Sequence, residues 1–97
     1  MASLMRRVEQ TPRFRRDIKR ERAGPFGPKL VQLLQPVIDI LVADQPLQAR
    51  YRDHALVGNW KGHRDCHIRP DLVLIYRKVG TDILQLVRLG SHGQLGI

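Results

Sequence analysis

The sequence predicts an α+β domain in which two N-terminal helices pack on one face of a small antiparallel sheet. Up to about residue 45, apolar residues recur at helical spacing, whereas residues 53–90 contain short runs rich in β-branched and aliphatic residues. Helices followed by strands in one short chain are typical of the α+β class. Because 97 residues leave room for only one modest core, we expect a single domain over residues 1–97.

The first helix is expected in "TPRFRRDIKRERAG", after a short segment, "SLMRRVEQ", that can form an edge strand. Thr11 is suited to cap this helix, Pro12 to occupy its first position and Gly24 to end it. Phe14 and Ile18 fall on one face, and most of the other residues are charged. The basic residues form either a solvated face or a surface for RNA or an acidic partner. They are Arg7, Arg13, Arg15, Arg16, Lys19, Arg20 and Arg22.

The second helix is expected in "KLVQLLQPVIDILVADQP", after the turn "GPFGP". Its apolar residues follow the spacing of a helix that packs one broad face on a core. They are Leu30, Leu33, Leu34, Val37, Ile38 and Leu41. Pro36 removes a backbone donor and crowds the preceding turn, so we expect a kink or a helix restart there.

The second half of the chain predicts three consecutive strands. "WKGHRDCHI", "DLVLIYRKV" and "TDILQLVRLG" are separated by the tight connection "RPD" and by a turn at residues 79–82. Short turns between consecutive strands make an antiparallel meander. The expected element order is therefore β-α-α-β-β-β, with a short turn or helix at the C-terminus.

Composition restricts the function classes. Seventeen Lys and Arg residues against nine Asp and Glu give a net charge of +8, which favours a polyanionic partner such as nucleic acid, or an acidic protein. No apolar run reaches the roughly 18 residues of a membrane span, and the N-terminus does not resemble a secretory signal. With a single cysteine there is no internal disulfide, so we expect a cytoplasmic protein without a membrane partner.

The stretch "WKGHRDCHIRPDLVLIY" gathers two histidines, a cysteine and two aspartates. On a strand, His63 and His67 are roughly 13 Å apart, too far for one zinc ion with bonds of about 2 Å. Cys66 points to the face opposite His67, so we expect it in the core, and we expect no metal site and no cofactor. His63, Asp65 and His67 would share the face that the helices leave uncovered. There they serve either for solubility or for acid–base catalysis on RNA, whose 2′-OH supplies the nucleophile.

A longer motif resembles that of a known protein family. "YRDHALVGNWKGHRDCHIRPDLVLIY" followed by "LQLVRLGSH" is similar to the YafQ-type toxins of the RelE/ParE superfamily. Their pattern is Asp-His-x-Leu-x-Gly-x-Trp-Lys-Gly-x-Arg-(Asp/Glu)-x-His-(Ile/Val)-x-Pro-Asp-aromatic, a strand, and Arg-x-Gly-(Ser/Thr)-His-x-x-Leu-Phe. The match covers residues 51–95 and leaves the helical half outside the motif.

The resemblance implies the toxin of a bacterial type II toxin–antitoxin system. Such toxins are ribosome-dependent endoribonucleases that cut messenger RNA without a metal ion and are blocked by a co-encoded antitoxin. We then expect a monomer alone and a hetero-oligomer with the antitoxin. The family's functional positions fall on His54, His67, Asp71, Arg88 and His92.

The resemblance also suggests roles for these positions. His92 is expected to be the general acid, and the base to be one of His54, His67 and Asp71. Arg88 would stabilise phosphate charge. Lys61 and Arg64 are expected to hold the RNA backbone, although strand alternation sends Arg64 toward the helices.

Two positions depart from the family pattern. Leu72 follows the Pro-Asp where the family has an aromatic residue, and Gly96 stands where the family has Phe. Since stacking a base on an aromatic ring contributes about 1–3 kcal/mol, a weakened nuclease is one alternative. Another is a binding toxin of the gyrase-inhibiting branch, although that branch lacks the histidines. Trp60 is expected to be a core anchor.

Overall fold

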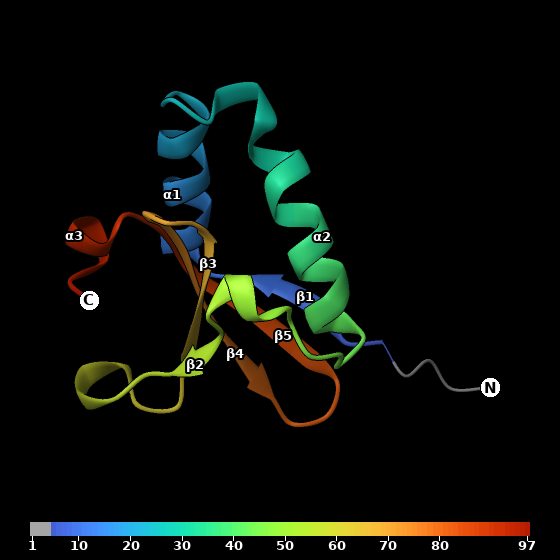
Figure 1. Cartoon of the computed structure of the whole chain (residues 1–97). Coiled ribbons are helices and arrows are strands. Elements are labelled where there is room, and N and C mark those ends of the chain that lie inside the picture. The colour runs from blue at the N-terminus through green and yellow to red at the C-terminus, as the bar shows by residue number, and fades with distance from the viewer. Residues whose placement is uncertain (1–4) are drawn as a thin grey trace.

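The computed structural model describes residues 5–97, so residues 3 and 4 of the expected edge strand lie outside the described residues. The elements follow the expected order, with one additional short strand (Figure 1). They are β1 (Arg7–Gln10), α1 (Pro12–Arg22), α2 (Leu30–Val42), β2 (His54–Ala55), β3 (Arg64–Arg69), β4 (Leu72–Val79), β5 (Ile83–Gly90) and α3 (His92–Leu95). Short 3₁₀ turns precede α2, β2 and β3.

The sheet has the strand order β1-β5-β4-β3-β2. The predicted meander is confirmed, because β3, β4 and β5 pair antiparallel in sequence order. The prediction of a purely antiparallel sheet was wrong, since β1 runs parallel to β5 with Arg7 opposite Ile83. Parallel neighbours require a long crossover, which here consists of the two helices and the meander itself.

The main core lies between the helices and one face of the sheet. In Figure 1, α1 and α2 stand as neighbouring columns over the strands. Phe14 of α1 and Leu34 of α2 are buried in one cluster with Cys66, Leu74 and strand residues of the same face. The burial of Cys66 confirms the predicted alternation, and its pKa is raised because burial disfavours the thiolate.

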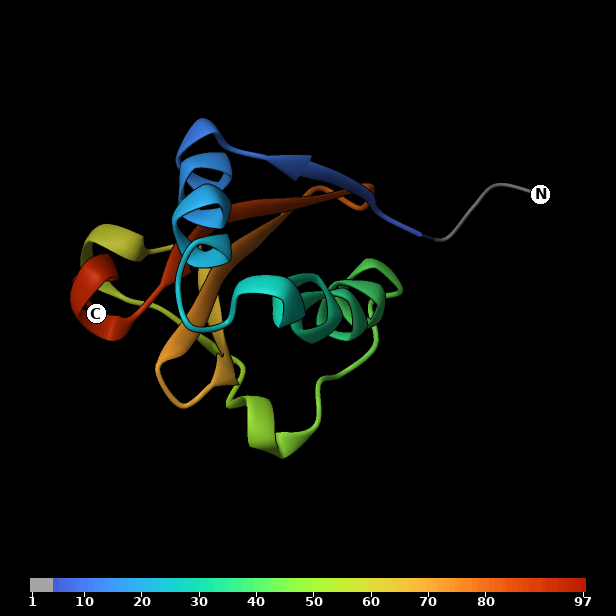
Figure 2. The same ribbon diagram turned by 90° about the horizontal axis from the view of Figure 1, so that it is seen from above.

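The sequence suggested that the opposite face of the sheet would be open, but in the structure this face is partly covered. Figure 2 shows α3 and the 3₁₀ turn that precedes β3 on the side of the strands away from α2. Val73, Ile75 and Leu95 are buried there, with Leu56 and Trp60 packed around them. Trp60 therefore anchors a second, smaller cluster, and the covered area leaves only part of this face to solvent.

Both helices begin close to where they were predicted. The Thr11 hydroxyl accepts a hydrogen bond from the Phe14 amide at 3.0 Å, Pro12 is the first helical residue, and α1 ends at Arg22, just before Gly24. Of the kink or helix restart predicted at Pro36, the restart was wrong, because α2 is one helix from Leu30 to Val42 with Pro36 inside it. Pro36 is exposed, so water can satisfy the carbonyl that it leaves without a donor.

Candidate active site

Three histidines that are distant in sequence meet at one end of the partly covered face. His54 comes from β2, His67 from β3 and His92 from the first position of α3. The ring centroid of His67 lies 6.3 Å from that of His54 and 5.0 Å from that of His92. The fold therefore brings together three of the expected site residues, with His67 in contact with both others.

His92 is held by Asp71, which lies in the turn between β3 and β4. Asp71 Oδ1 accepts hydrogen bonds from the His92 backbone amide at 2.9 Å and from Nδ1 at 2.7 Å. The bond at Nδ1 leaves Nε2 as the nitrogen available to a substrate. The same two bonds, the backbone one first, lower the pKa of Asp71. Asp71 is thus an ionised group that orients His92.

The turn that carries His92 is fixed by its own cap. The Ser91 hydroxyl accepts from the Gln94 amide at 3.1 Å, and Gln94 Oε1 accepts from the Ser91 amide at 2.8 Å. This reciprocal capping box satisfies donors at the start of α3. The backbone of His92 is therefore preorganised before any substrate arrives.

His54 is oriented by the backbone and lies over a buried carboxylate. Its Nδ1 is 2.7 Å from the carbonyl oxygen of Arg52 and 3.1 Å from Oδ1 of Asp65. Because Nδ1 is directed at the carbonyl, Oδ1 of Asp65 has no hydrogen-bond partner among the described residues. Burial raises the pKa of Asp65, opposed by the nearby charges of His54, His67 and His92. Asp65 is therefore a buried acid beneath the histidines.

The pKa of His67 is lowered. Burial is the main cause, and the charges of His92, Arg52 and His54 add to it, while Asp65 opposes it. A lowered pKa keeps the imidazole neutral at physiological pH. Two histidines that present Nε2, with a neutral imidazole between them, can together move protons on either side of a bound phosphate.

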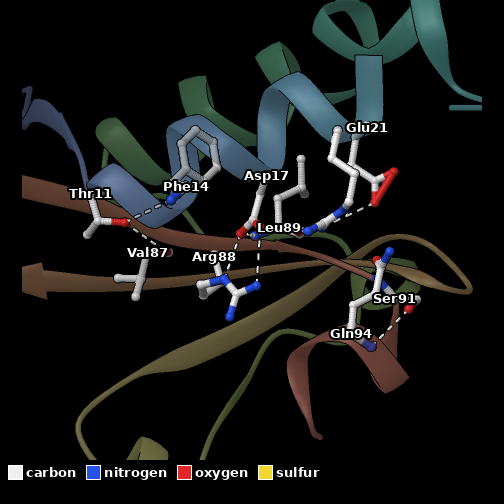
Figure 3. A network of polar contacts seen from close by, with 10 residues as sticks. Thr11, Phe14, Asp17, Glu21, Val87, Arg88, Leu89, Ser91 and Gln94 are labelled. Carbon is white, nitrogen blue, oxygen red and sulfur yellow. Dashed lines mark hydrogen bonds and ion pairs between the residues drawn. The ribbon is translucent and has the colours of Figure 1, made fainter. Parts of the chain in front are cut away.

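Arg88 lies on the same face but is bound to α1. The strand register forms a row across the sheet in which His54 is opposite Asp65, Asp65 opposite Ile75, and Ile75 opposite Arg88. The Arg88 guanidinium donates to both carboxylate oxygens of Asp17, at 2.7 and 3.1 Å (Figure 3). With strands about 4.8 Å apart, Arg88 lies roughly 10 Å from Asp65 between Cα atoms.

Asp17 connects α1 to the part of β5 that, within residues 5–97, has no pairing partner on its β1 side, because β1 ends before it. It also accepts from the Leu89 amide at 2.9 Å and from Arg20 Nη1 at 2.9 Å. Burial alone would raise the pKa of Asp17, but the hydrogen bonds from Arg88 and Leu89 hold it below its usual range. Thr11 donates to the Val87 carbonyl at 2.8 Å, so side chains of α1 cover this strand edge.

Neither of the two expected RNA-binding residues, Lys61 and Arg64, lies in the histidine cluster. Arg64 is on the helix side and donates to Asp53 at 3.2 Å, while Tyr76 donates to the same carboxylate oxygen. Lys61 is exposed in the turn before β3. His63 stacks edge-on against Trp60, at 5.3 Å between centroids, and no ring contact joins it to His67 within residues 5–97.

The two departures from the family pattern also have distinct positions. Leu72 is fully buried in the main core, so its side chain faces the helices rather than the histidines. Gly96 is the C-cap of α3 with φ of 70°, a conformation that costs glycine little. The residue before it, Leu95, supplies the apolar anchor for the second cluster.

Two residues of the site, Asp17 and Arg52, were missed by sequence reasoning, whereas Asp65 was expected on this face but not as a buried carboxylate next to His54. Asp17 carried one signal, since it lies three positions after Phe14 and is one of only two acidic residues in a mostly basic helix. Arg52 adopts φ of 50°, a left-handed conformation that nothing in the sequence predicted. Over the described part of the chain, no group of three His, Cys, Asp or Glu residues is arranged to hold a metal ion.

With this geometry established, comparison with known proteins identifies the family. The model for the bacterial toxin of type II toxin–antitoxin systems, YafQ, matches residues 6–96. The chain belongs to the YafQ toxin family. Among curated relatives, the putative toxin YafQ of Haemophilus influenzae is 40% identical over 98 residues, covering 94% of this chain and 92% of that protein. The mRNA interferase toxin YafQ of Escherichia coli K12 is 34% identical over 93 residues, covering 95% and 97%.

Solved structures of similar proteins have the same fold. The E. coli DinJ–YafQ complex superposes with a TM-score of 0.78 at 35% identity, covering 93% of this chain and 97% of the matched one. A metal-bound toxin from Helicobacter pylori superposes with a TM-score of 0.84 at 40% identity, covering 94% and 99%. Within residues 5–97, α1, α2 and α3 are all too short or too polar to cross a membrane.

Proposed function

We propose that this YafQ-family toxin is a ribosome-dependent endoribonuclease that cuts messenger RNA. The observation that carries the proposal is the meeting of His54, His67 and His92, two of them with Nδ1 fixed by an acceptor. The E. coli relative named mRNA interferase toxin YafQ supports the same substrate class. The net charge of +8 supports a polyanionic substrate.

The proposed reaction needs one base and one acid. The base removes the proton of a ribose 2′-OH, the 2′-oxygen attacks the adjacent phosphorus, and the bond to the 5′-oxygen breaks as the acid supplies its proton. The products are a 2′,3′-cyclic phosphate and a 5′-hydroxyl. In-line displacement sets the attacking and leaving oxygens on opposite sides of phosphorus, so base and acid belong on opposite sides of the phosphate.

His54 and His92 fit these two roles, because each contacts His67 from its own strand or helix. We assign His54 as base and His92 as acid, since the acceptors at Nδ1 leave Nε2 of each ring for the substrate. His67 would donate to a phosphate oxygen between them. Asp71 would position His92, and Arg88, held by Asp17, would stabilise the phosphate charge.

The antitoxin is the proposed protein partner. The solved complex of E. coli YafQ with DinJ shows such a partner for that relative. The toxin would be a monomer alone, would form a hetero-oligomer with an acidic antitoxin, and would act on translated messages in the ribosome in the cytoplasm.

The decisive experiment is to induce the protein in a bacterium and map new 5′ ends of messenger RNA, with His92→Ala as the comparison. We expect new ends within translated messages for the wild type and at least a hundredfold fewer for His92→Ala, because general acid catalysis contributes about 10²–10⁴-fold. Growth arrest without such ends, or equal cutting by both proteins, would contradict the nuclease proposal and favour a binding toxin.

A further inference from the structure

A hollow of about 510 Å³ opens beside the histidine cluster. His67 and His92 form part of its wall, and Ile68 and Pro70 contribute from the end of β3 and the turn after it. The remaining wall is basic and aromatic, with Arg50, Tyr51, Arg52 and Arg69. Among residues 5–97, no carboxylate lines the hollow. The space is within the range of small-ligand sites and adjoins the proposed reacting groups.

The three arginines of this hollow differ from four others in the described part of the chain, which are tied to aspartates. Arg6, Arg20, Arg64 and Arg88 each form an ion pair with an aspartate at 3.2 Å or less. Within residues 5–97, no ion pair joins Arg50, Arg52 or Arg69 to a carboxylate. Their charges are therefore free to attract an anion, and three such charges around one hollow concentrate that attraction.

Local contacts fix the side chain of Arg50 and the backbone of Arg52. Arg50 precedes Tyr51 in the 3₁₀ turn Ala49–Tyr51; its guanidinium lies 4.7 Å from the Tyr51 ring centroid and donates to the hydroxyl at 2.8 Å. Arg52 ends that turn in a left-handed conformation with φ of 50°, and its carbonyl accepts from His54. A strained non-glycine residue at this point links the basic wall to a candidate catalytic histidine.

Arg69 also lines the hollow. It is the last residue of β3, where the pairing with β4 shifts register between His67 and Arg69. Such an irregularity changes the direction of the side chains that follow it. Arg69 pairs with Leu72, which faces the helices, and His67 pairs with Val73 on the other face of β4, yet both side chains line the same hollow.

We propose that this hollow is a nucleotide subsite, in which Arg52 and Arg69 hold a message phosphate next to the cleaved bond and the Arg50–Tyr51 stack supports the neighbouring base. The proposal rests on the proposed function and names where the substrate strand runs. RNA phosphates are bound by arginine through paired hydrogen bonds, and unstacked bases lie on aromatic rings or guanidinium planes. Tyr51 in this subsite would supply an aromatic contact for RNA, whereas position 72, which is aromatic in the family pattern, is the buried Leu72 in this chain.

The first test measures binding without cleavage. A trinucleotide with 2′-O-methyl riboses, which has no nucleophile, is titrated into the isotopically labelled wild-type protein while NMR follows backbone amides and arginine Nε–H groups. We expect the largest shifts at Arg50, Arg52, Arg69 and His67. Shifts confined to the arginines of α1, or no binding at millimolar RNA, would overturn the proposal.

A matched pair of charge reversals sharpens this test. Arg69→Glu and Arg77→Glu change the net charge equally, but Arg77 lies on β4 about 17 Å along the strand from Leu72 and bonds to Gln85. We expect Arg69→Glu to weaken binding about tenfold and to lower the salt slope by about one, with less than a twofold effect for Arg77→Glu. Equal losses would mean non-specific attraction. Arg69→Gln serves if Arg69→Glu does not fold.

A ribosome assay separates the message from ribosomal RNA as the source of the phosphate. For a message phosphate, Arg69→Glu lowers cleavage of the programmed message at least tenfold and leaves affinity for message-free ribosomes unchanged. A loss of affinity for message-free ribosomes overturns the assignment to the message. If the wild type binds the trinucleotide at the hollow but cuts no message, the subsite stands and the nuclease proposal fails.

Discussion

Replacing Asp17 by alanine should be among the most destabilising single changes in this chain. Asp17 is 2% exposed, and its carboxylate accepts four hydrogen bonds, from Arg88 Nε and Nη2, Arg20 Nη1 and the Leu89 amide. Asp17→Ala leaves the Arg88 guanidinium, whose side chain is 11% exposed, without its partner. Breaking a buried ion pair costs about 3–5 kcal/mol, and an unsatisfied buried amide about 1–3 kcal/mol. Because these losses overlap, we expect about 4 kcal/mol.

The assay is urea denaturation at pH 7 followed by circular dichroism, with Asp39→Ala as the control. Asp39 is exposed and accepts one bond from Gln35, so its loss should change the free energy of unfolding by less than about 0.5 kcal/mol. Asp17→Asn keeps one acceptor for Leu89 and should lie between the two variants.

The pH dependence gives a second check on the same interaction. The folded pKa of Asp17 is depressed, so its stabilisation is present above the unfolded pKa of about 3.9 and is lost as pH falls through the folded pKa. The difference in unfolding free energy between wild type and Asp17→Ala should therefore shrink below about pH 4. A cost below 1 kcal/mol at pH 7, or a difference that does not change in acid, would refute the reasoning.

Three further predictions concern Gly90, Asp65 and Cys66. A Cβ at Gly90 would lie 2.7 Å from Arg20 Nη2 and 2.8 Å from Gln94 Oε1, so Gly90→Ala should lower the free energy of unfolding by roughly 1–2 kcal/mol in urea denaturation. An unchanged free energy of unfolding would mean that both side chains move freely. Burial raises the pKa of Asp65, so its ionisation lowers stability as pH rises above the unfolded pKa, and Asp65→Asn should gain stability relative to wild type between pH 4 and pH 7. The low-pH limb of the cleavage profile of Asp65→Asn should move to lower pH, because the histidines lose a neighbouring negative charge. An unmoved limb would mean that the charge of Asp65 does not act on the histidines. Cys66 is fully buried and its thiol pKa is raised, so iodoacetamide should modify it only after unfolding, which mass spectrometry can show. Rapid labelling of the folded protein would contradict the packing of Cys66 in the core.

The sequence alone determined what depends on neighbours along the chain. Thr11 and Pro12 set the start of α1 through a cap and a fixed backbone angle, and the turn at Gly80 fixes the register of β4 against β5. Alternation along β3 sent Cys66 to the helix face and His67 to the other. The motif in residues 51–95 predicted the family that the comparison confirmed.

The tertiary structure decided what depends on segments that meet only in the fold. β1 is too short for its pattern to name a partner, and its parallel pairing with β5 joins residues more than seventy positions apart. Asp17 meets Arg88 across 71 positions, and Asp71 meets His92 across 21. A side chain's charge state and partners follow from burial and from neighbours brought by packing. For that reason the sequence could offer His54, His67 and His92 as candidates, but only the fold showed that they form one cluster beside Arg50, Arg52 and Arg69.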